Sequence, residues 1–185
     1  MRNWAAEHEA GRWSFLSEPP EQGRLALVAA LARMYGEGTV IDVGCARGEL
    51  RHWLDPRVFH RYVGVDITAA AFRGAGPSDI VSEWIEAGIE SYEPPPIPGA
   101  VIVFSEVLYY LERPERELVR LSQALKANCA LVSITVPGTR HPEYRDRVAA
   151  IWEAIGRLTW RMAADLTLAD ERGGERWRIA ALVPL

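Results

Sequence analysis

The chain is poor in lysine and cysteine, and it has no long uninterrupted apolar run. Lys126 is the only lysine, and the formal net charge is -4, so composition gives no general electrostatic reason to bind nucleic acid. No run approaches the roughly 18 apolar residues that mark a membrane-spanning helix, and the first residues, MRNWAAEHEAGRW, lack the apolar core of a signal peptide. The two cysteines, Cys45 and Cys129, lie far apart in or near predicted strands, which argues against a disulfide framework. We therefore expect a soluble, cytoplasmic protein.

The residues that are present predict one α/β domain. A chain of 185 residues with 49% hydrophobic residues can bury one sizeable core, so we expect a single domain over 1–185, with an N-terminal arm over 1–20 and the core over 21–185. Strand-like and helix-like segments alternate, which predicts a mostly parallel sheet of seven strands with helices on both faces. Predicted strands cover 40–43, 62–67, 80–85, 100–104 and 130–136, and predicted helices cover 22–35, 49–54, 114–126 and 142–155.

Two details of this pattern are specific enough to test. The helix over 22–35 carries apolar residues at helical spacing, with Met34 among them. The strand-like runs 158–168 and 177–183 are joined through Gly173 and Gly174, which predicts an antiparallel hairpin at the end of the sheet.

The segment VIDVGCARGEL, residues 40–50, predicts a buried strand that runs into a turn of small residues. Such a turn lets the backbone approach a nucleotide-like ligand closely. A dinucleotide fingerprint needs the pattern G-x-G-x-x-G, whereas here the small residues alternate, at Gly44, Ala46 and Gly48. This alternation resembles the first motif of the class I S-adenosylmethionine-dependent methyltransferases. The resemblance covers roughly residues 36–185, and it implies a Rossmann-like fold and S-adenosyl-L-methionine as cofactor, with S-adenosyl-L-homocysteine as product.

Two acids lie near the carboxyl ends of the first two predicted strands. Asp66 stands at the end of YVGVDIT, where a carboxylate can accept hydrogen bonds from both ribose hydroxyls of a cofactor; its alternative is a helix N-cap, because Asp66 and Thr68 both precede helix-like sequence. An acid at this place also fits NAD, so Asp66 alone does not choose between cofactors. Asp42 is similar to the first-motif acid of the family, which the resemblance places near the methionine end of the cofactor. The alternative role of Asp42 is structural, in which its carboxyl holds the turn in place.

The segment WIEAGIESYEPP resembles the region of the family that contacts adenine. The position that often carries Asp in the family is Gly88 here, so we expect backbone contact and apolar packing from Ile67 and Ile89. Glu86 or Glu90 could take the place of that Asp in contacting adenine, but surface charge is the preferred interpretation for each. The full set of residues expected to bind the cofactor is Trp13, Asp42, Gly44, Cys45, Ala46, Gly48, Asp66, Ile67, Ala87, Gly88, Ile89 and Ser105.

The segment FSEVLYYLERP ends the fourth predicted strand with an abrupt run of polar groups. Ligands of open α/β sheets bind at this edge. The segment resembles small-molecule N-methyltransferases of the nodulation protein S type, which implies that Ser105 and Glu106 face the methionine end of the cofactor. Tyr109 or Tyr110 would line the acceptor pocket, with the other ring packed in the core. Bacterial RNA 2'-O-methyltransferases have a metal-binding Glu-His where this chain has the two tyrosines, so we expect no metal site.

Histidines and the N-terminal arm supply the remaining candidates. His141 lies in a loop on the same sheet edge as Glu106 and is a candidate base or hydrogen-bond donor; its alternative is a solvated loop histidine, and His52 and His60 are expected to be structural. The arm is rich in rings, and small methyltransferases use such an arm as a lid whose aromatic faces attract a cation. The alternative is that these rings only anchor the arm to the core: Trp4, His8, Trp13 and Phe15.

These observations predict transfer of a methyl group to a small molecule, with an amine favoured over a hydroxyl. The candidate catalytic residues are Glu106, Tyr109, Tyr110 and His141. An O-methyltransferase that uses His141 or Glu106 as base, a non-catalytic cofactor-binding protein and a nicotinamide dehydrogenase are the alternatives. The expected partner is a small-molecule methyl acceptor, with no nucleic acid and no membrane, and the expected state is a monomer or homodimer.

Overall fold

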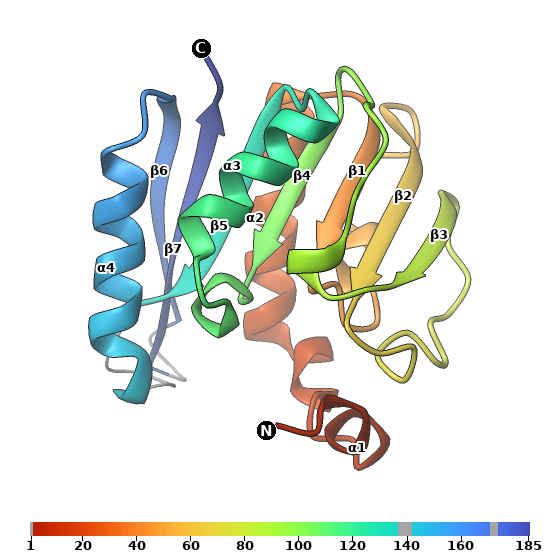
Figure 1. Ribbon diagram of the computed structural model, residues 1–185. Helices are drawn as coiled ribbons and strands as arrows, with labels where there is room; N and C mark the ends of the chain where they lie inside the picture. The colour runs from red at the N-terminus through yellow and green to blue at the C-terminus, as the bar shows by residue number, and fades with distance from the viewer. Residues whose placement is uncertain (1, 137–141, 171–173) are drawn as a thin grey trace.

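The computed structural model describes residues 2–136, 142–170 and 174–185, and its centre is one seven-stranded sheet (Figure 1). The strands follow the order β3-β2-β1-β4-β5-β7-β6 across the sheet. Their bounds are β1 Gly38–Val43, β2 Phe59–Asp66, β3 Val81–Glu86, β4 Val101–Ser105, β5 Cys129–Thr135, β6 Arg161–Asp170 and β7 Glu175–Val183. The predicted α/β fold is confirmed, including the number of strands.

The first five strands run parallel, and β7 lies antiparallel to both β5 and β6. The predicted terminal hairpin is therefore confirmed. From β1 the chain moves outward to β3 and then returns to place β4 on the other side of β1. At such a reversal the connections leave toward opposite faces, so a crevice opens at the carboxyl ends of the two strands. The ends of β1 and β4 are thus the place where the fold favours a ligand.

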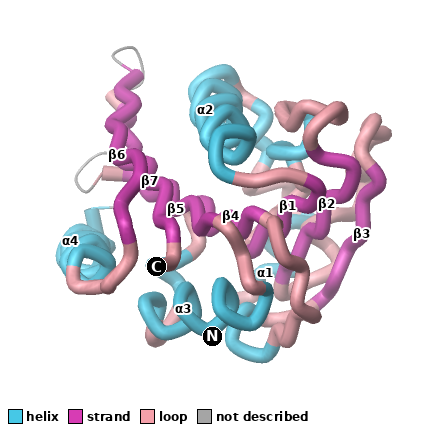
Figure 2. The backbone as a smooth tube through the Cα atoms, turned by 90° about the horizontal axis from the view of Figure 1, so that it is seen from above, coloured by secondary structure: helices cyan, strands magenta, loops and turns pink. Residues whose placement is uncertain are grey.

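Helices cover both faces of the sheet, as Figure 2 shows. The long helix α2 (Pro19–Tyr35) packs on one face, whereas α3 (Pro114–Leu125) and α4 (Arg145–Gly156) pack on the other. The sheet separates two buried apolar clusters: Leu25 and Val28 of α2 belong to one, and Leu118 of α3 with Ile151 of α4 belongs to the other. Both faces of the central strands are therefore covered by helices, whereas the carboxyl ends of these strands remain available for a site.

The helix α2 begins with Pro19 and Pro20 in its first turn and ends at Gly36, as its sequence favours. One expectation for its apolar face was wrong, since Met34 is 69% exposed. Met34 follows Leu25 by about two and a half helical turns, which places it on the opposite side of the helix from that buried residue.

Two other local expectations were wrong. The predicted helix over 49–54 is one short 3₁₀ turn, η2 (Glu49–His52). The sequence that follows Asp66 and Thr68, expected to be helix-like, forms turns and bends up to residue 80 instead. Asp66 therefore has no helix to cap, and this alternative for its role is removed. The predicted helix over 142–155 is present as a 3₁₀ turn, η5 (Pro142–Tyr144), followed by α4.

The N-terminal arm folds as α1 (Trp4–Glu9) and a 3₁₀ turn, η1 (Ser14–Ser17). Figure 1 places α1 beyond the carboxyl ends of the parallel strands. No residue of α1 is fully buried, so the arm lies over the strand ends without entering either apolar cluster. Among the described residues, no helix has the length and apolar character needed to cross a lipid bilayer.

Candidate active site

The turn after β1 is shaped by two glycines in left-handed backbone conformation. Gly44 has a φ of +74° and Gly48 a φ of +70°, which side chains disfavour. A Cβ at Gly44 would lie 2.5 Å from Val107 Cγ2, and one at Gly48 would lie 2.4 Å from Trp84 Cη2. The chain's own packing therefore demands both glycines. Only Gly44 also lines the cavity described below.

Ala46 lies between these glycines and also has positive φ, at 47°. Its backbone N–H donates a hydrogen bond of 3.0 Å to Asp66 Oδ2, which links the turn to the end of β2. Asp66 is 8% exposed, and burial raises the pKa of its carboxyl. One oxygen of Asp66 thus holds the turn in place while the residue also lines the cavity.

Asp42 is a buried acid in β1 with one oxygen satisfied and one free. Oδ2 accepts a 2.7 Å hydrogen bond from the Tyr62 hydroxyl, whereas Oδ1 has no hydrogen-bond partner among the described residues. Burial raises the pKa of Asp42 to about 7, against the Tyr62 hydrogen bond and the positive charge of Arg24, which both lower it. Because Asp42 lines the cavity, its free oxygen is available to a ligand.

Arg24 is a charged residue of this site that the sequence analysis did not predict. It is 2% exposed, forms a 2.8 Å ion pair with the equally buried Glu21, and donates a hydrogen bond to the Ser105 hydroxyl. A signal was present: Arg24 is followed at helical spacing by apolar Val28 and preceded three positions earlier by an acid. A charged pair on the buried face of a helix indicates a polar site behind that face.

Glu106 follows β4 in a strained backbone conformation, with a φ of 54°. Its side chain is buried, and its Oε2 accepts hydrogen bonds from Tyr109 Oη at 2.9 Å and from Thr135 Oγ1 at 2.6 Å. Burial raises the pKa of Glu106, partly offset by Arg24 and by these two donors. Oε1 has no hydrogen-bond partner among the described residues. Glu106 lines the cavity, so its free carboxyl oxygen is available to a ligand.

The two adjacent tyrosines lie on a 3₁₀ turn, η4 (Leu108–Tyr110), and do different things. Tyr110 lines the cavity, whereas Tyr109 is 4% exposed and supports Glu106 from behind. This agrees with the expectation that only one of the two rings faces the site. The two ring centroids are 4.5 Å apart, so Tyr109 also fixes the place of Tyr110.

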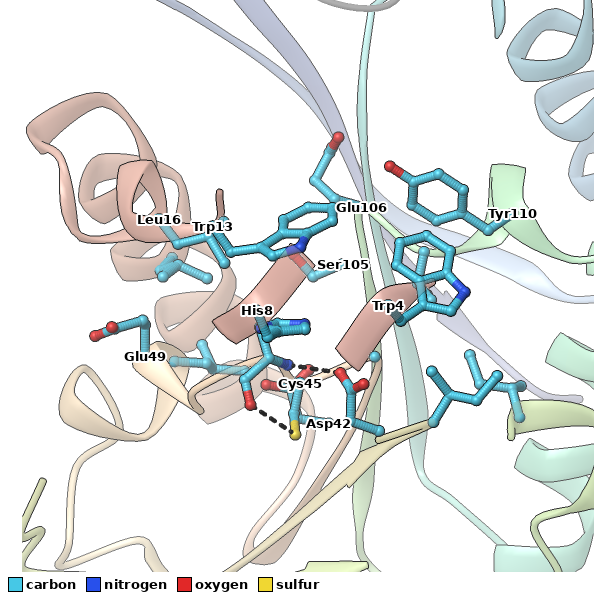
Figure 3. Close-up of a pocket in the computed structure, with 18 of the residues that line it drawn as sticks. Trp4, His8, Trp13, Leu16, Asp42, Cys45, Glu49, Ser105, Glu106 and Tyr110 are labelled. Carbon is cyan, nitrogen blue, oxygen red and sulfur yellow. Dashed lines mark hydrogen bonds between the residues drawn. The ribbon is translucent and has the colours of Figure 1, made fainter. Parts of the chain in front are cut away.

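These residues surround a cavity of about 260 Å³ at the carboxyl ends of β1, β2 and β4. The arm covers it with Trp4, His8, Trp13 and Leu16, and Figure 3 shows Trp4 and Tyr110 side by side, with His8 above Asp42 and Cys45. Small-molecule pockets usually enclose about 300–1,000 Å³, so with the arm in this place the cavity is slightly smaller than usual.

Most residues predicted to bind a cofactor come together around this cavity. The lining includes Trp13, Asp42, Gly44, Cys45, Ala46, Asp66, Ile67, Ile89 and Ser105. Gly48, Ala87 and Gly88 are not part of the lining. Among the candidate catalytic residues, Glu106 and Tyr110 line the cavity, Tyr109 lies behind Glu106, and His141 lies outside the described residues. The exposed His52 and His60 do not contribute.

The region expected to contact adenine is only partly as predicted. Ile67 and Ile89 line the cavity, as apolar packing requires. Glu86 accepts a 2.8 Å hydrogen bond from the Ala69 backbone N–H, away from the cavity, whereas Glu90 lies in its wall. The interpretation as surface charge is therefore sufficient for Glu86 but not for Glu90.

Cysteine chemistry and metal binding have little support at this site. Cys45 and Cys129 are both buried and free, and burial raises the pKa of each thiol. Within the described ranges, no group of three or more His, Cys, Asp or Glu residues could hold a metal ion.

A mostly parallel seven-stranded sheet closed by an antiparallel hairpin, with acids gathered at the β1, β2 and β4 ends, defines the class I S-adenosylmethionine-dependent methyltransferases. The chain belongs to this class. A family model described as "Methyltransferase domain" matches residues 12–178, so the chain is a member of the methyltransferase domain family. It is an enzyme, and its methyl donor is S-adenosylmethionine. The dehydrogenase and non-catalytic alternatives are thereby set aside.

Solved structures with the same fold include several methyltransferases. The N-methyltransferase NodS from Bradyrhizobium japonicum, in complex with S-adenosylhomocysteine, is 16% identical with a TM-score of 0.71 over 92% of this chain and 90% of that one. A complex from Haloferax volcanii between the Trm112 methyltransferase activator and a methyltransferase gives 16% identity and a TM-score of 0.74 over 100% of both chains. A didemethyltoxoflavin N1-methyltransferase from Burkholderia thailandensis is 12% identical, with a TM-score of 0.71 over 97% of this chain and 84% of that one. At these identities the likeness shows the fold alone. No curated protein sequence matches the chain.

Proposed function

We propose that this enzyme N-methylates a small-molecule amine and that Glu106 receives a proton from the acceptor. The observation that carries the proposal is the free Oε1 of Glu106, a buried carboxyl oxygen with no partner among the described residues. Tyr109 and Thr135 hold the other oxygen, so the carboxyl cannot turn without losing two hydrogen bonds. A fixed, open acceptor of this kind fits a group that takes a proton during turnover.

The charges of the cavity fit S-adenosylmethionine. Its methionine end carries an ammonium and a carboxylate, and the cavity offers the free oxygen of Asp42 together with the cationic Arg24. Asp66 would hold the ribose hydroxyls, and Ile67 with Ile89 would pack on the base. When bound, this cofactor supplies a methyl group on a positively charged sulfur, which a nucleophile in line with the bond can attack.

The remaining work of the protein is positioning and water exclusion. The arm residues Trp4, His8 and Trp13 cover the cavity and would exclude water from it. The strained backbone at Glu106 places that carboxyl at the end of β4, beside Ser105, where the fold favours a ligand.

An amine that arrives as its ammonium form has no lone pair for attack. Glu106 as a carboxylate would take one N–H proton on Oε1: the N–H bond breaks, the O–H bond forms, and the lone pair is left on nitrogen. Burial raises the pKa of Glu106, which favours the carboxyl that holds this proton. The names of two structural neighbours, an N-methyltransferase and an N1-methyltransferase, also support an amine acceptor.

The proposal predicts the effect of Glu106→Gln. The substitution keeps the size of the side chain and removes the proton acceptor, so turnover of the preferred amine should fall about a hundredfold, the lower end of general-base effects. The wild-type rate should rise with pH through the titration of Glu106, and the variant should lose that rise. Binding of S-adenosylhomocysteine, measured by calorimetry, should change little, and Glu112→Gln, an exposed acid near the same strand end, is the matched control.

The choice between amine and hydroxyl is tested with acceptor panels and isotope-labelled S-adenosylmethionine. Methyl transfer to amines supports the proposal, and transfer to hydroxyls alone would replace it with an O-methyltransferase. That second candidate is kept because a buried carboxylate such as Glu106 can also take the proton of a hydroxyl. A fall in turnover of Glu106→Gln on a hydroxyl acceptor would then assign the base.

We further propose that residues 1–185 act as one domain in the cytoplasm, on a small molecule rather than on nucleic acid. The uninterrupted sheet and the net charge of -4 support this organisation. Sedimentation of the purified chain would decide between monomer and homodimer.

A further inference from the structure

A cation already lies against three aromatic rings that line the cavity. The guanidinium carbon of Arg2 is 4.2 Å from the ring centroid of Trp4, 5.1 Å from that of Tyr110 and 5.5 Å from that of Trp13. Aromatic faces attract cations within about 6 Å because the ring quadrupole is negative there. Three rings around one charge form a cage, which we call the aromatic cage: Trp4, Trp13 and Tyr110.

The rings of the aromatic cage support one another, so the cage does not depend on Arg2 for its shape. Trp4 meets Tyr110 edge to face, with centroids 4.9 Å apart, and Trp4 and Trp13 are 6.0 Å apart. Tyr110 in turn packs against Tyr109 at 4.5 Å and against Tyr144 at 5.7 Å. Two separate segments, the arm and η4, thus bring their rings together around one point.

The aromatic cage belongs to the wall of the cavity. Trp4, Trp13 and Tyr110 all line it, and so does Glu106 with its free oxygen. A positively charged ligand group would therefore find the negative faces of three rings and a buried carboxyl in one enclosure. In contrast, a neutral ligand would leave the rings without the charge that Arg2 now provides.

Arg2 is held at the rings by exchangeable polar contacts. Its side chain is 38% exposed, and its polar partners are Tyr110 and Glu7, which accepts hydrogen bonds of 2.9 Å from Nε and from Nη2. A bidentate pair of this kind holds Arg2 in place, so a ligand has to displace it from the rings. Arg2 precedes α1, so its side chain can turn away from the rings without moving Trp4 and without disturbing either apolar cluster.

We propose that the aromatic cage is the subsite for the cationic ammonium group of the methyl acceptor, and that Arg2 occupies this subsite in the ligand-free enzyme. The inference deepens the proposed function and rests on it, because it names the charge state in which the amine is first bound. Arg2 then competes with the acceptor, and its removal opens the subsite.

The test uses choline as a permanent cation and dimethylbutanol as its uncharged isostere. Calorimetric titration of the full chain should give about tenfold tighter choline binding in Arg2→Ala than in the wild type, since a cation–π competitor has been removed. Dimethylbutanol should bind both chains equally weakly. Arg12→Ala, which removes an exposed arginine from the same arm, should behave as the wild type.

Ring substitutions in the Arg2→Ala background identify the subsite. Trp4→Leu should abolish the gain in choline affinity, and Trp4→Phe should restore part of it because a phenyl face keeps a weaker quadrupole. Tyr110→Leu gives a second variant outside the arm, and thermal melting checks that each chain is folded. An unchanged choline affinity in Arg2→Ala, or an equal gain for dimethylbutanol, would overturn the proposal.

A third comparison separates the acceptor from the donor. If the rings served the sulfonium of S-adenosylmethionine, Trp4→Leu would weaken binding of that cation and spare neutral S-adenosylhomocysteine; this result would overturn the acceptor subsite. The choline titration contains no cofactor and no turnover. Its failure therefore leaves N-methylation untouched, and methylation of hydroxyls alone would contradict the proposed function without changing the titration.

Discussion

At the scale of single residues, the site concentrates ionisable groups where water is scarce. Asp42 and Glu106 are buried acids at the ends of neighbouring strands, and Arg24 is the cation whose field lowers the pKa of both. Burial is the larger effect on each, so both pKa values are raised. A ligand that brings a positive charge beside Asp42 would offset the free-energy cost of burying its charged carboxylate. The site therefore favours positively charged ligand groups over neutral ones.

The raised pKa of Asp42 predicts a pH dependence of folding stability. Between the ordinary pKa of Asp, 3.8, and its folded value of about 7, the folded protein binds a proton that the unfolded chain has released. The stability that this proton contributes is fully present below pH 3.8, the ordinary pKa, and it is lost as the pH rises through the folded-state pKa of about 7. In Asp42→Asn this loss disappears, so the variant should gain on the order of 4 kcal/mol relative to the wild type across the window.

Urea unfolding of both chains at several pH values, without cofactor, measures this difference. Asp146→Asn, at an exposed position of α4, controls for a change of charge alone. Stability curves of wild type and Asp42→Asn that stay parallel from about pH 4 to about pH 7 would contradict the raised pKa.

The sequence identified the acids of the site more readily than the groups that hold them. Asp42, Asp66 and Glu106 could be predicted because each lies at or beside the carboxyl end of a strand, at the same edge of a parallel sheet. Arg24 could not be placed in this way, since it comes from a helix whose orientation depends on how α2 packs on the sheet. The separate tasks of Tyr109 and Tyr110 likewise depend on the 3₁₀ form of η4, which adjacency in sequence does not reveal.

At the scale of elements, the arm is the part of the structure most separable from the core. Its helix α1 has no buried residue, yet Trp4, His8 and Trp13 form the cover of the cavity. Strands and long helices could be predicted because their apolar periodicity is strong. The sequence that follows Thr68 was expected to be helical but forms turns and bends, because its Ala-rich start has helical propensity that the structure does not use.

Removal of residues 1–13 tests whether the arm is a lid or an anchor. Since α1 buries little, the melting temperature of the truncated chain should fall by no more than a few degrees. For a chain of this size, that shift corresponds to a loss of about 1 kcal/mol in the free energy of unfolding. It should bind S-adenosylhomocysteine about tenfold more weakly, because three cavity-lining rings are lost. Calorimetry and thermal melting give the two values on the same samples.

A full-length chain with Trp4, His8 and Trp13 all replaced by Ala is the control for this truncation. It should match the truncated chain in affinity if the rings are what the arm contributes. A large fall in melting temperature with unchanged affinity would show instead that the arm anchors the fold.

At the scale of the whole molecule, the cavity joins the two halves of the sheet. Its walls come from β1 and β2 on one side of the reversal, from the end of β4 on the other, and from the arm above. A ligand that contacts all of these parts binds the folded state and has no equivalent site in the unfolded chain. Ligand binding should therefore stabilise the molecule as a unit.

This coupling makes thermal stabilisation a test of the cofactor. At about a hundred times its dissociation constant, S-adenosylhomocysteine should add about 2.7 kcal/mol to the free energy of unfolding and raise the melting temperature by about 5–10 °C. NAD should not, because the small residues after β1 alternate and the turn lacks the dinucleotide spacing. Asp66→Ala should lose most of the rise, since this acid is the group available to ribose hydroxyls and also holds Ala46. An equal rise in melting temperature with NAD would contradict the interpretation of the turn after β1 as one that excludes a dinucleotide. If Asp66→Ala kept the rise with S-adenosylhomocysteine, another residue would bind the ribose.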